Sequence, residues 1–192
     1  MKQQTTHPSA PAAAGPFRTA VVLGLLFASL SSQAQVTIVL SNKWRLQAGS
    51  QPFLSTSSGW PRGLAINWIT GNVLLPMPNP SRQVRILSGA DGSDLGTLDT
   101  TGITGGYNGI SLIQAGVADD GVIYACNLDL SAGIFQVWRW SAEDTYLTAL
   151  SAFGRATPGT VNTRIGDSFA VRGAGTNTQL IASGSGSGYY TV

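Results

Sequence analysis

Short apolar stretches separated by turns rich in Gly, Asp and Asn run through most of the chain. One example begins with Gly63 to Trp68, continues through the polar turn Thr70 to Asn72, and ends with the apolar residues Val73 to Leu75. Asp-Gly and Gly-Asn pairs supply the positive φ that tight hairpin turns need. Beyond the first 34 residues no stretch shows helical periodicity with caps, so the pattern predicts β-hairpins.

The hairpin pattern recurs at a nearly constant step. Ala65, Ala118 and Ala170 take the same place in three similar segments, 53 and 52 residues apart. A second marker, formed by Val84 and Val137, keeps the step of 53 residues. Two independent markers with one period indicate a true internal repeat.

Each repeat unit contains two hairpins, and therefore four strands. In the first unit these strands are expected near 63–68, 72–77, 82–88 and 94–99. Four-stranded antiparallel sheets repeated at about 40–50 residues are typical of β-propeller blades. We therefore predict an all-β, β-propeller-like fold of about three four-stranded blades, with units near 60–110, 111–163 and an incomplete one at 164–192. Because propellers typically close with about four to eight blades, the predicted ring is incomplete.

An apolar run of eleven residues from Ala20 to Leu30 follows Arg18, and small residues lead up to Ala34. These are the parts of a secretory signal peptide. A permanent membrane span needs about 20 apolar residues, so this run is too short for one. We expect a signal peptide over 1–34, a partial propeller domain over 35–192, and no membrane span after cleavage. The expected location is secreted or periplasmic, including the cell surface.

Charge and residue counts narrow the classes of partner. The 11 basic residues include Lys2 and Arg18 of the predicted leader, which leaves nine against 9 acidic residues. A neutral mature chain lacks the basic surface that attracts nucleic acid or anionic lipid. His7, the only His, also lies in the leader, and Cys126 is the only Cys. Neither an internal disulfide nor a tetrahedral zinc site is therefore available, and we expect no cofactor.

Several motifs, in this order and spacing, are similar to a family of exported bacterial propeller-like proteins that carry a domain of unknown function. The motifs are Arg62 to Ala65, Asp94 to Leu98, Gly116 to Ala125, Val137 to Trp140 and Gly166 to Gly173. The resemblance extends from near Gly59 to the last residue. Members of that family often end in a sorting tail of the PEP-CTERM type, which this sequence does not show. The resemblance implies a secreted propeller, and it brings no established activity and no catalytic residues.

Catalytic patterns are weak in this sequence. Without His in the mature chain, a Ser-His-Asp triad is excluded, and Cys126 has no imidazole to activate it, so we expect Cys126 to be a buried strand residue. Glu143 is the only Glu, which argues against paired-carboxylate catalysis. Five aspartates flank turns, where Asp bonds the local backbone: Asp91, Asp94, Asp119, Asp120 and Asp144. The segment from Asp91 to Asp94 resembles a calcium loop only faintly.

The loops that lead into the innermost strands of a propeller usually carry its ligand site. By the repeat spacing, Arg62, Ala115 and Asp167 are equivalent, and Arg62 and Asp167 could line such a site together with Asn108 and Arg172. Ion pairs or hydrogen bonds between blades are the alternative role for these residues.

The tryptophans are the other candidates, since exposed aromatic rings stack on sugars. Trp138 and Trp140 share one face of a strand, where packing between blades is the favoured role. Trp44 and Trp60 lie in less regular sequence, and the pattern assigns them neither of these two roles.

Together these patterns favour a secreted, non-catalytic binding or scaffold module, acting toward surface polysaccharide or another protein. The alternative is a propeller enzyme, such as a lactonase-like metal hydrolase, with its site partly in missing blades. That alternative requires several Asp, Glu or Asn side chains, Asp167 and Asn108 among them, converging on one metal-sized space. A functionless gene fragment is a third possibility.

Overall fold

A computed structural model describes residues 41–54, 61–78, 82–130, 134–156, 164–184 and 190–191. The chain divides into two units, Met1–Ser41 and Asn42–Val192, and the strands of the described residues lie in the second. The predicted signal peptide, residues 1–34, and Trp60 lie outside the described residues. Among the described residues, no helix is long and apolar enough to span a membrane.

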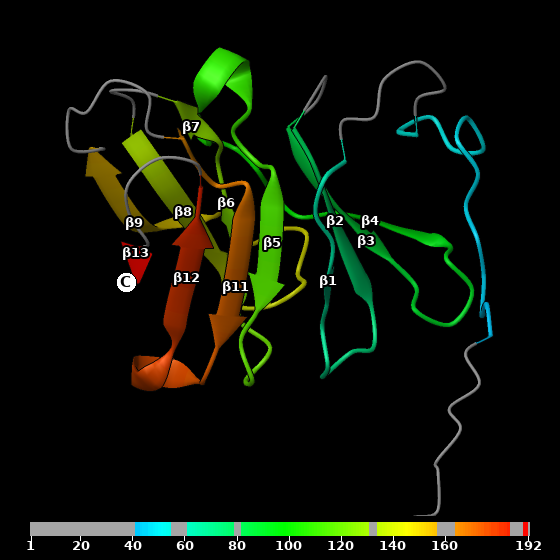
Figure 1. Ribbon diagram of the computed structural model, residues 1–192. Helices are drawn as coiled ribbons and strands as arrows, with labels where there is room; N and C mark the ends of the chain where they lie inside the picture. Colours follow the sequence, from blue (N-terminus) through cyan, green and yellow to red (C-terminus); the bar gives the residue numbers. More distant parts are fainter. Residues whose placement is uncertain are drawn as a thin grey trace, which may run out of the picture. The chain divides into compact units, whose positions relative to one another are not determined.

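The second unit is all-β and contains three larger antiparallel sheets (Figure 1). Sheet 1 has the order β1 (Ala65–Ile66), β2 (Val73–Met77), β3 (Gln83–Leu87) and β4 (Asp94–Thr97). Sheet 2 has the order β5 (Gln114–Val117), β6 (Ile123–Cys126), β8 (Ile134–Trp140) and β9 (Leu150–Ala156). Sheet 3 has the order β11 (Ser168–Arg172), β12 (Gln179–Ser183) and β13 (Tyr190–Thr191).

Two kinds of smaller element were not predicted: a pair of short strands and two 3₁₀ turns. The short strands β7 (Asp129–Leu130) and β10 (Arg164–Ile165) pair antiparallel with each other. This pairing joins the β6–β8 connection of sheet 2 to the segment just before β11 of sheet 3. Two single 3₁₀ turns, η2 (Tyr107–Gly109) and η3 (Gly175–Asn177), lie in loops. Such short pairs carry little sequence signal, because two residues cannot show a period.

The predicted hairpins of the first two units are confirmed, and local chemistry explains them. The carboxylates of Asp91, Asp94, Asp120 and Asp144 each accept a hydrogen bond from the backbone N–H two residues further on. This bond bends the chain into an Asx turn, as expected for Asp beside a hairpin. Gly71 and Gly121 take positive φ values of 75° and 84° in their hairpin turns, where a side chain would be strained.

In the structure the two marker valines are equivalent, whereas Ala118 is shifted relative to Ala65. Val84 faces Pro76 in β2 and Val137 faces Cys126 in β6, and both valines are fully buried, so this pair is equivalent. Ala118, in contrast, lies just beyond β5, whereas Ala65 lies within β1. The reason is the connection between the second and third strands: Val84 follows its partner Pro76 by 8 residues, whereas Val137 follows Cys126 by 11.

Two apolar clusters hold the sheets together. The cluster between sheets 1 and 2 includes Leu74, Val84, Ile86, Ile123, Ala125 and Trp140, with Trp138 packed against it. The cluster between sheets 2 and 3 includes Tyr124, Cys126, Phe135, Val137, Leu180 and Ala182. Each fully buried aliphatic side chain stabilises the fold by about 1.5–3 kcal/mol. Sheet 2 therefore has both faces covered, as the buried pattern of every residue in β6 shows.

The expected structural roles of Cys126, Trp138 and Trp140 are confirmed. Cys126 is fully buried, and this burial raises the pKa of its thiol far above the ordinary value. Trp140 is fully buried, and its indole N–H donates to the backbone oxygen of Asp99 at 2.8 Å. Trp44 donates from Nε1 to the oxygen of Gly89 at 3.1 Å and lies against the β3–β4 hairpin.

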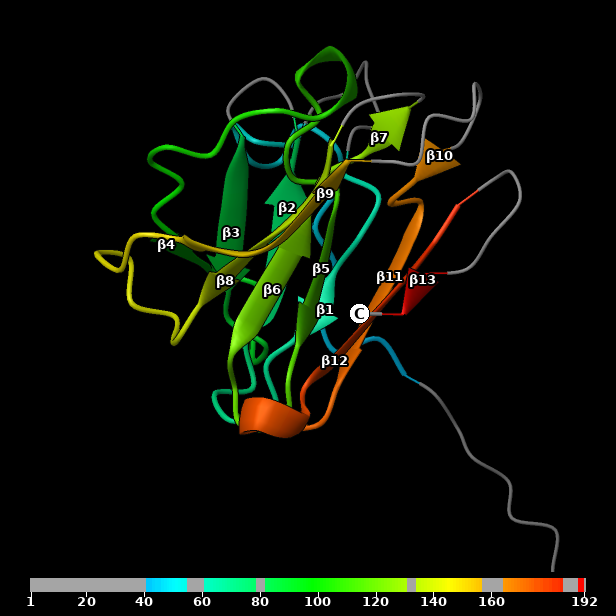
Figure 2. The ribbon, with the colours of Figure 1, turned by 90° about the vertical axis from the view of Figure 1, so that its left-hand side faces the viewer.

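The first strands of the three sheets lie side by side, with β5 between β1 and β11 (Figure 1). Figure 2 shows the paired short strands β7 and β10 at one end of the sheets. Two glycines allow the first strands to approach one another. A Cβ added at Gly63 would lie 2.2 Å from Oε1 of Gln114, and one added at Gly116 would lie 2.5 Å from Cγ2 of Val171. Within the described residues the sheets do not close on themselves, so sheets 1 and 3 each have one face without a sheet on it.

Candidate functional site

Two places in the second unit combine polar side chains from different sheets. One lies where the chain enters the first strands and includes two of the residues predicted from the sequence. The other is a pocket between sheets 1 and 2 that sequence reasoning missed.

At the strand entrances, Gln114 connects all three sheets. Its Nε2 atom donates to the backbone oxygen of Asp167 at 2.9 Å and, more weakly, to that of Arg62 at 3.4 Å. Gln114 thus brings the backbone of Arg62 and that of Asp167 together. The contacts are made by their backbone, so the side chains of Arg62 and Asp167 remain exposed.

Asp167 is engaged in an ion pair rather than in a ligand set. Arg164 donates from Nη2 to Oδ1 of Asp167 at 2.6 Å, and its Nε bonds the second carboxylate oxygen. The hydrogen bond that Arg164 donates to the carboxylate of Asp167 raises the pKa of Arg164 above its ordinary value. Arg164 lies in β10 and Asp167 lies just before β11, so this ion pair is local in the sequence and does not connect two of the three larger sheets. It is partly exposed, with side-chain exposures of 32% and 37%, so we assign it a local ordering role.

Asn108 and Arg172 take different places. Asn108 lies in η2, before β5, with a φ of 49° that is unusual for a residue other than Gly. Arg172 is the last residue of β11, at the end opposite Asp167, and its Nε donates to Oε1 of Gln179 at 2.6 Å. The predicted grouping of Arg172 with Arg62 and Asp167 is therefore wrong, because the whole of β11 separates its two ends.

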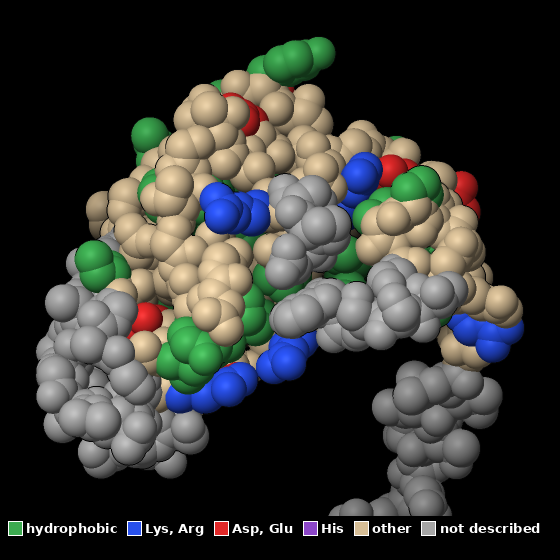
Figure 3. All heavy atoms as spheres, turned by 90° about the horizontal axis from the view of Figure 1, so that it is seen from above, with side chains coloured by type: hydrophobic (Ala, Val, Ile, Leu, Met, Phe, Trp, Pro, Cys, Tyr) green, Lys and Arg blue, Asp and Glu red, His purple; other side chains and the backbone are tan. Residues whose placement is uncertain are grey.

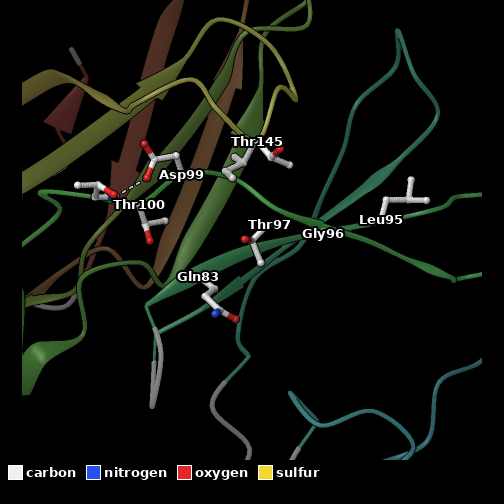
Figure 4. A pocket seen from close by; sticks show the side chains of 9 residues that line it. Gln83, Leu95, Gly96, Thr97, Asp99, Thr100 and Thr145 are labelled. Atoms are coloured by element: carbon white, nitrogen blue, oxygen red, sulfur yellow. Dashed lines mark hydrogen bonds between the residues drawn. The ribbon is translucent and has the colours of Figure 1, made fainter.

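The missed pocket has a volume of about 520 Å³ and opens at the junction of sheets 1 and 2 (Figure 4). Its lining comes from β3, from β4 and the loop after it, and from the β8–β9 loop: Gln83, Leu95, Gly96, Thr97, Leu98, Asp99, Thr100, Thr101 and Thr145. Four of these nine residues are threonines, and one is charged. The run Thr97-Leu98-Asp99-Thr100-Thr101 is the sequence signal that could have indicated it.

Asp99 organises one side of this pocket. Its Oδ1 accepts from the backbone N–H of Thr101 at 2.9 Å, and its Oδ2 accepts from the hydroxyl of Thr148 at 2.9 Å. Hydrogen bonds from Thr101, first from its side chain and then from its backbone, and from Thr148 hold the pKa of Asp99 below its ordinary value. The pocket therefore presents a carboxylate that stays ionised at neutral pH.

One exposed apolar side chain lines the pocket: that of Leu95, which is 51% exposed. A Cβ added at Gly96 would lie 3.6 Å from Cγ2 of Thr145, which shows how closely β4 and the β8–β9 loop approach.

The described residues hold no group of three or more His, Cys, Asp or Glu side chains that could bind a metal ion. Glu143, the only Glu, accepts from the Thr70 hydroxyl and from Nδ2 of Asn72, both at 2.7 Å, and so connects a hairpin of sheet 1 to sheet 2. Basic side chains on the face seen from above are separated by uncharged surface rather than merged into one patch (Figure 3). The chemistry available in the pocket is hydrogen bonding and attraction to positive charge.

Neither a protein-family model nor a curated protein matches this sequence. Among solved structures, a DUF4623 family protein from Bacteroides eggerthii is similar, with a TM-score of 0.46 and 14% sequence identity. The match covers 69% of this chain and 42% of that one, so the chain spans less than half of its length.

Proposed function

We propose that this chain is an exported, non-catalytic binding module that holds a neutral, hydroxyl-rich ligand, such as surface polysaccharide, in the pocket between sheets 1 and 2. The observation that carries the proposal is the pocket of about 520 Å³ lined by four threonines and a single carboxylate. Its size suits a small ligand or a short segment of a longer one, since ligand pockets range over about 300–1,000 Å³.

The lining favours sugars over other ligands for two reasons. Each Thr hydroxyl can both donate and accept, which matches the hydroxyls of a sugar. The ionised carboxylate of Asp99 accepts hydrogen bonds from ligand hydroxyls but repels anions, so neutral glycans should bind better than those containing uronic acids.

A propeller-like arrangement belongs to the same proposal. Three sheets packed face to face, with their first strands adjacent, support it, because propeller blades pack in this way. Export to the periplasm or cell surface is supported by the leader-like residues 1–34.

The test compares binding of neutral and uronate-containing oligosaccharides by calorimetry after a glycan array has selected a neutral ligand. Thr97→Val and Thr145→Val each remove one lining hydroxyl with little change of shape, and each should raise Kd by about fivefold through loss of a hydrogen bond of about 1 kcal/mol. Thr104→Val, an exposed site outside the pocket, is the matched control and should bind like the wild type. The proposal fails if no neutral glycan binds, or if the control weakens binding as much as the two lining variants.

A further inference from the structure

We propose that two copies of this chain associate head to tail, with the open face of sheet 1 in each copy packed on the open face of sheet 3 in the other. The inference rests on an exposed apolar strip and on the way the chain already packs one of its own sheets on another.

The apolar strip lies on the first strand of sheet 1. Ala65 is buried toward sheet 2, so the alternation of a strand turns its neighbours Leu64 and Ile66 to the opposite face. Leu64 is 63% exposed, Ile66 is 40% exposed, and Trp68, in the following turn, is 74% exposed. Two large apolar side chains on one sheet face, with a third in the turn that follows, are unusual unless another surface covers them.

The chain itself covers only the far part of this face. Leu75 points away from the Leu74 side chain, which is buried toward sheet 2, and it faces Arg85 in β3. The guanidinium of Arg85 lies 4.6 Å from the centre of the Phe53 ring. A segment before β1 therefore lies over β3, while the strip on β1 is left in contact with solvent.

Sheet 3 shows what the strip is suited to contact. By the repeat, Leu64 and Ile66 correspond to Phe169 and Val171, which flank Ala170 as the first pair flanks Ala65. Phe169 and Val171 pack against the cluster on sheet 2, where Gly116 leaves room for Val171. The corresponding residues of sheet 3 thus pack on the first strand of a neighbouring sheet, and the strip on β1 is suited to pack in the same way.

The open face of sheet 3 offers such a strand. Val171 is turned to sheet 2, so Ala170 lies on the opposite face, where it is exposed and pairs with Ile181, which is 39% exposed. Ala170 takes the place in sheet 3 that Gly116 takes in sheet 2, where the small residue leaves room for Val171. The small side chain of Ala170 should leave room for a facing residue in the same way. We therefore match Ile66 of one copy to Ala170 of the other.

A twofold axis forms both junctions at once, because each copy has one strip and one open face on sheet 3. Two copies of three sheets give six sheets in a ring, within the range of about four to eight blades over which propellers close. Association would also bury the strip on β1, which a single copy leaves exposed.

The test measures the mass of the full chain by light scattering over a range of concentrations. The wild type should have about twice the chain mass of 19.9 kDa. Ile66→Lys and Ala170→Arg lie on different sheets, and each should raise the dimer Kd by at least about tenfold, because each spoils both junctions. Leu150→Lys and Ala174→Arg change exposed residues outside the junctions and should stay dimeric.

Mixing the two variants distinguishes this arrangement from others. In a mixed pair, one junction combines both substitutions and the other combines two wild-type faces, so the mixture should regain part of the dimer. A wild type that is monomeric at all concentrations overturns the proposal. So does a dimer lost with Ile66→Lys but kept with Ala170→Arg, since that result indicates that two sheet 1 faces meet. Circular dichroism confirms that both variants are folded.

Discussion

At the scale of single residues, aspartates fix the turns of this chain, and one of them also connects two sheets. Asp120 bonds the backbone of its own turn at Val122, and its Oδ2 also accepts from the backbone N–H of Gly175 in sheet 3 at 2.9 Å. A second contact binds the same hairpins, from the N–H of Asp119 to the oxygen of Gly173 at 2.8 Å. The turn role of Asp120 follows from the sequence, but its bond to Gly175 requires the packed fold.

This bond makes a pH-dependent contribution to stability. The N–H of Gly175 is the main cause that holds the pKa of Asp120 below its ordinary value. A lowered pKa means that the contribution is present above the unfolded value, about 3.9, and is lost as pH falls through the folded value. Asp120→Ala should lower the free energy of unfolding by about 1 kcal/mol at pH 7, and by less below about pH 4.

Urea unfolding at several pH values measures this difference. Asp144→Ala is the control, because the bond that the carboxylate of Asp144 accepts among the described residues, from the N–H of Tyr146, lies within its own turn. An equal effect of Asp120→Ala at pH 7 and pH 2.5 would contradict the prediction.

At the scale of elements, strand positions followed from the sequence better than contacts between strands did. Alternation and turn residues predicted the two hairpins of the first unit, and their strands lie within or close to the expected ranges. The step between first strands was harder to predict, because the longer connection between β6 and β8 displaces Ala118 from β5. Gly63 and Gly116 read as ordinary strand or turn glycines, and only the fold shows that a neighbouring strand lies against each.

Gly116 tests the importance of this close approach. Gly116→Ala places a methyl group against Val171, and overpacking of this kind should destabilise the protein by about 1–3 kcal/mol. In a Val171→Ala background the same substitution should be milder, because the clashing Cγ2 atom is gone. Urea unfolding of the four proteins in this double-mutant cycle gives the coupling between the two sites. Additive effects would show that β5 and β11 do not press on each other there.

At the scale of the whole second unit, sheet 2 shares its two faces between two apolar clusters. Loss of either cluster should therefore weaken the packing of sheet 2 as a whole. Val84 and Val137 are equivalent residues, one in each cluster, and both are fully buried. They make a matched pair for testing whether the two clusters unfold together.

Val84→Ala and Val137→Ala should each destabilise the protein by about 2 kcal/mol and shift one common thermal transition. Tryptophan fluorescence and far-ultraviolet circular dichroism should give the same midpoint in each variant. Leu150→Ala, at a site 63% exposed, should change the midpoint little. Two separate transitions in either buried variant would show that the sheets fold independently.

The sequence by itself determined the class of structure, the hairpins and the buried roles of Cys126 and Trp140, because alternation and turn chemistry act over a few neighbouring residues. Tertiary structure decided the rest. Gln114 meets the backbone of Arg62 and Asp167 across gaps of 52 and 53 residues, and Arg172 is kept at the other end of its strand. The pocket exists only because β4 and the β8–β9 loop, distant in the chain, lie against each other. No local pattern specifies such contacts, since they depend on how whole sheets pack.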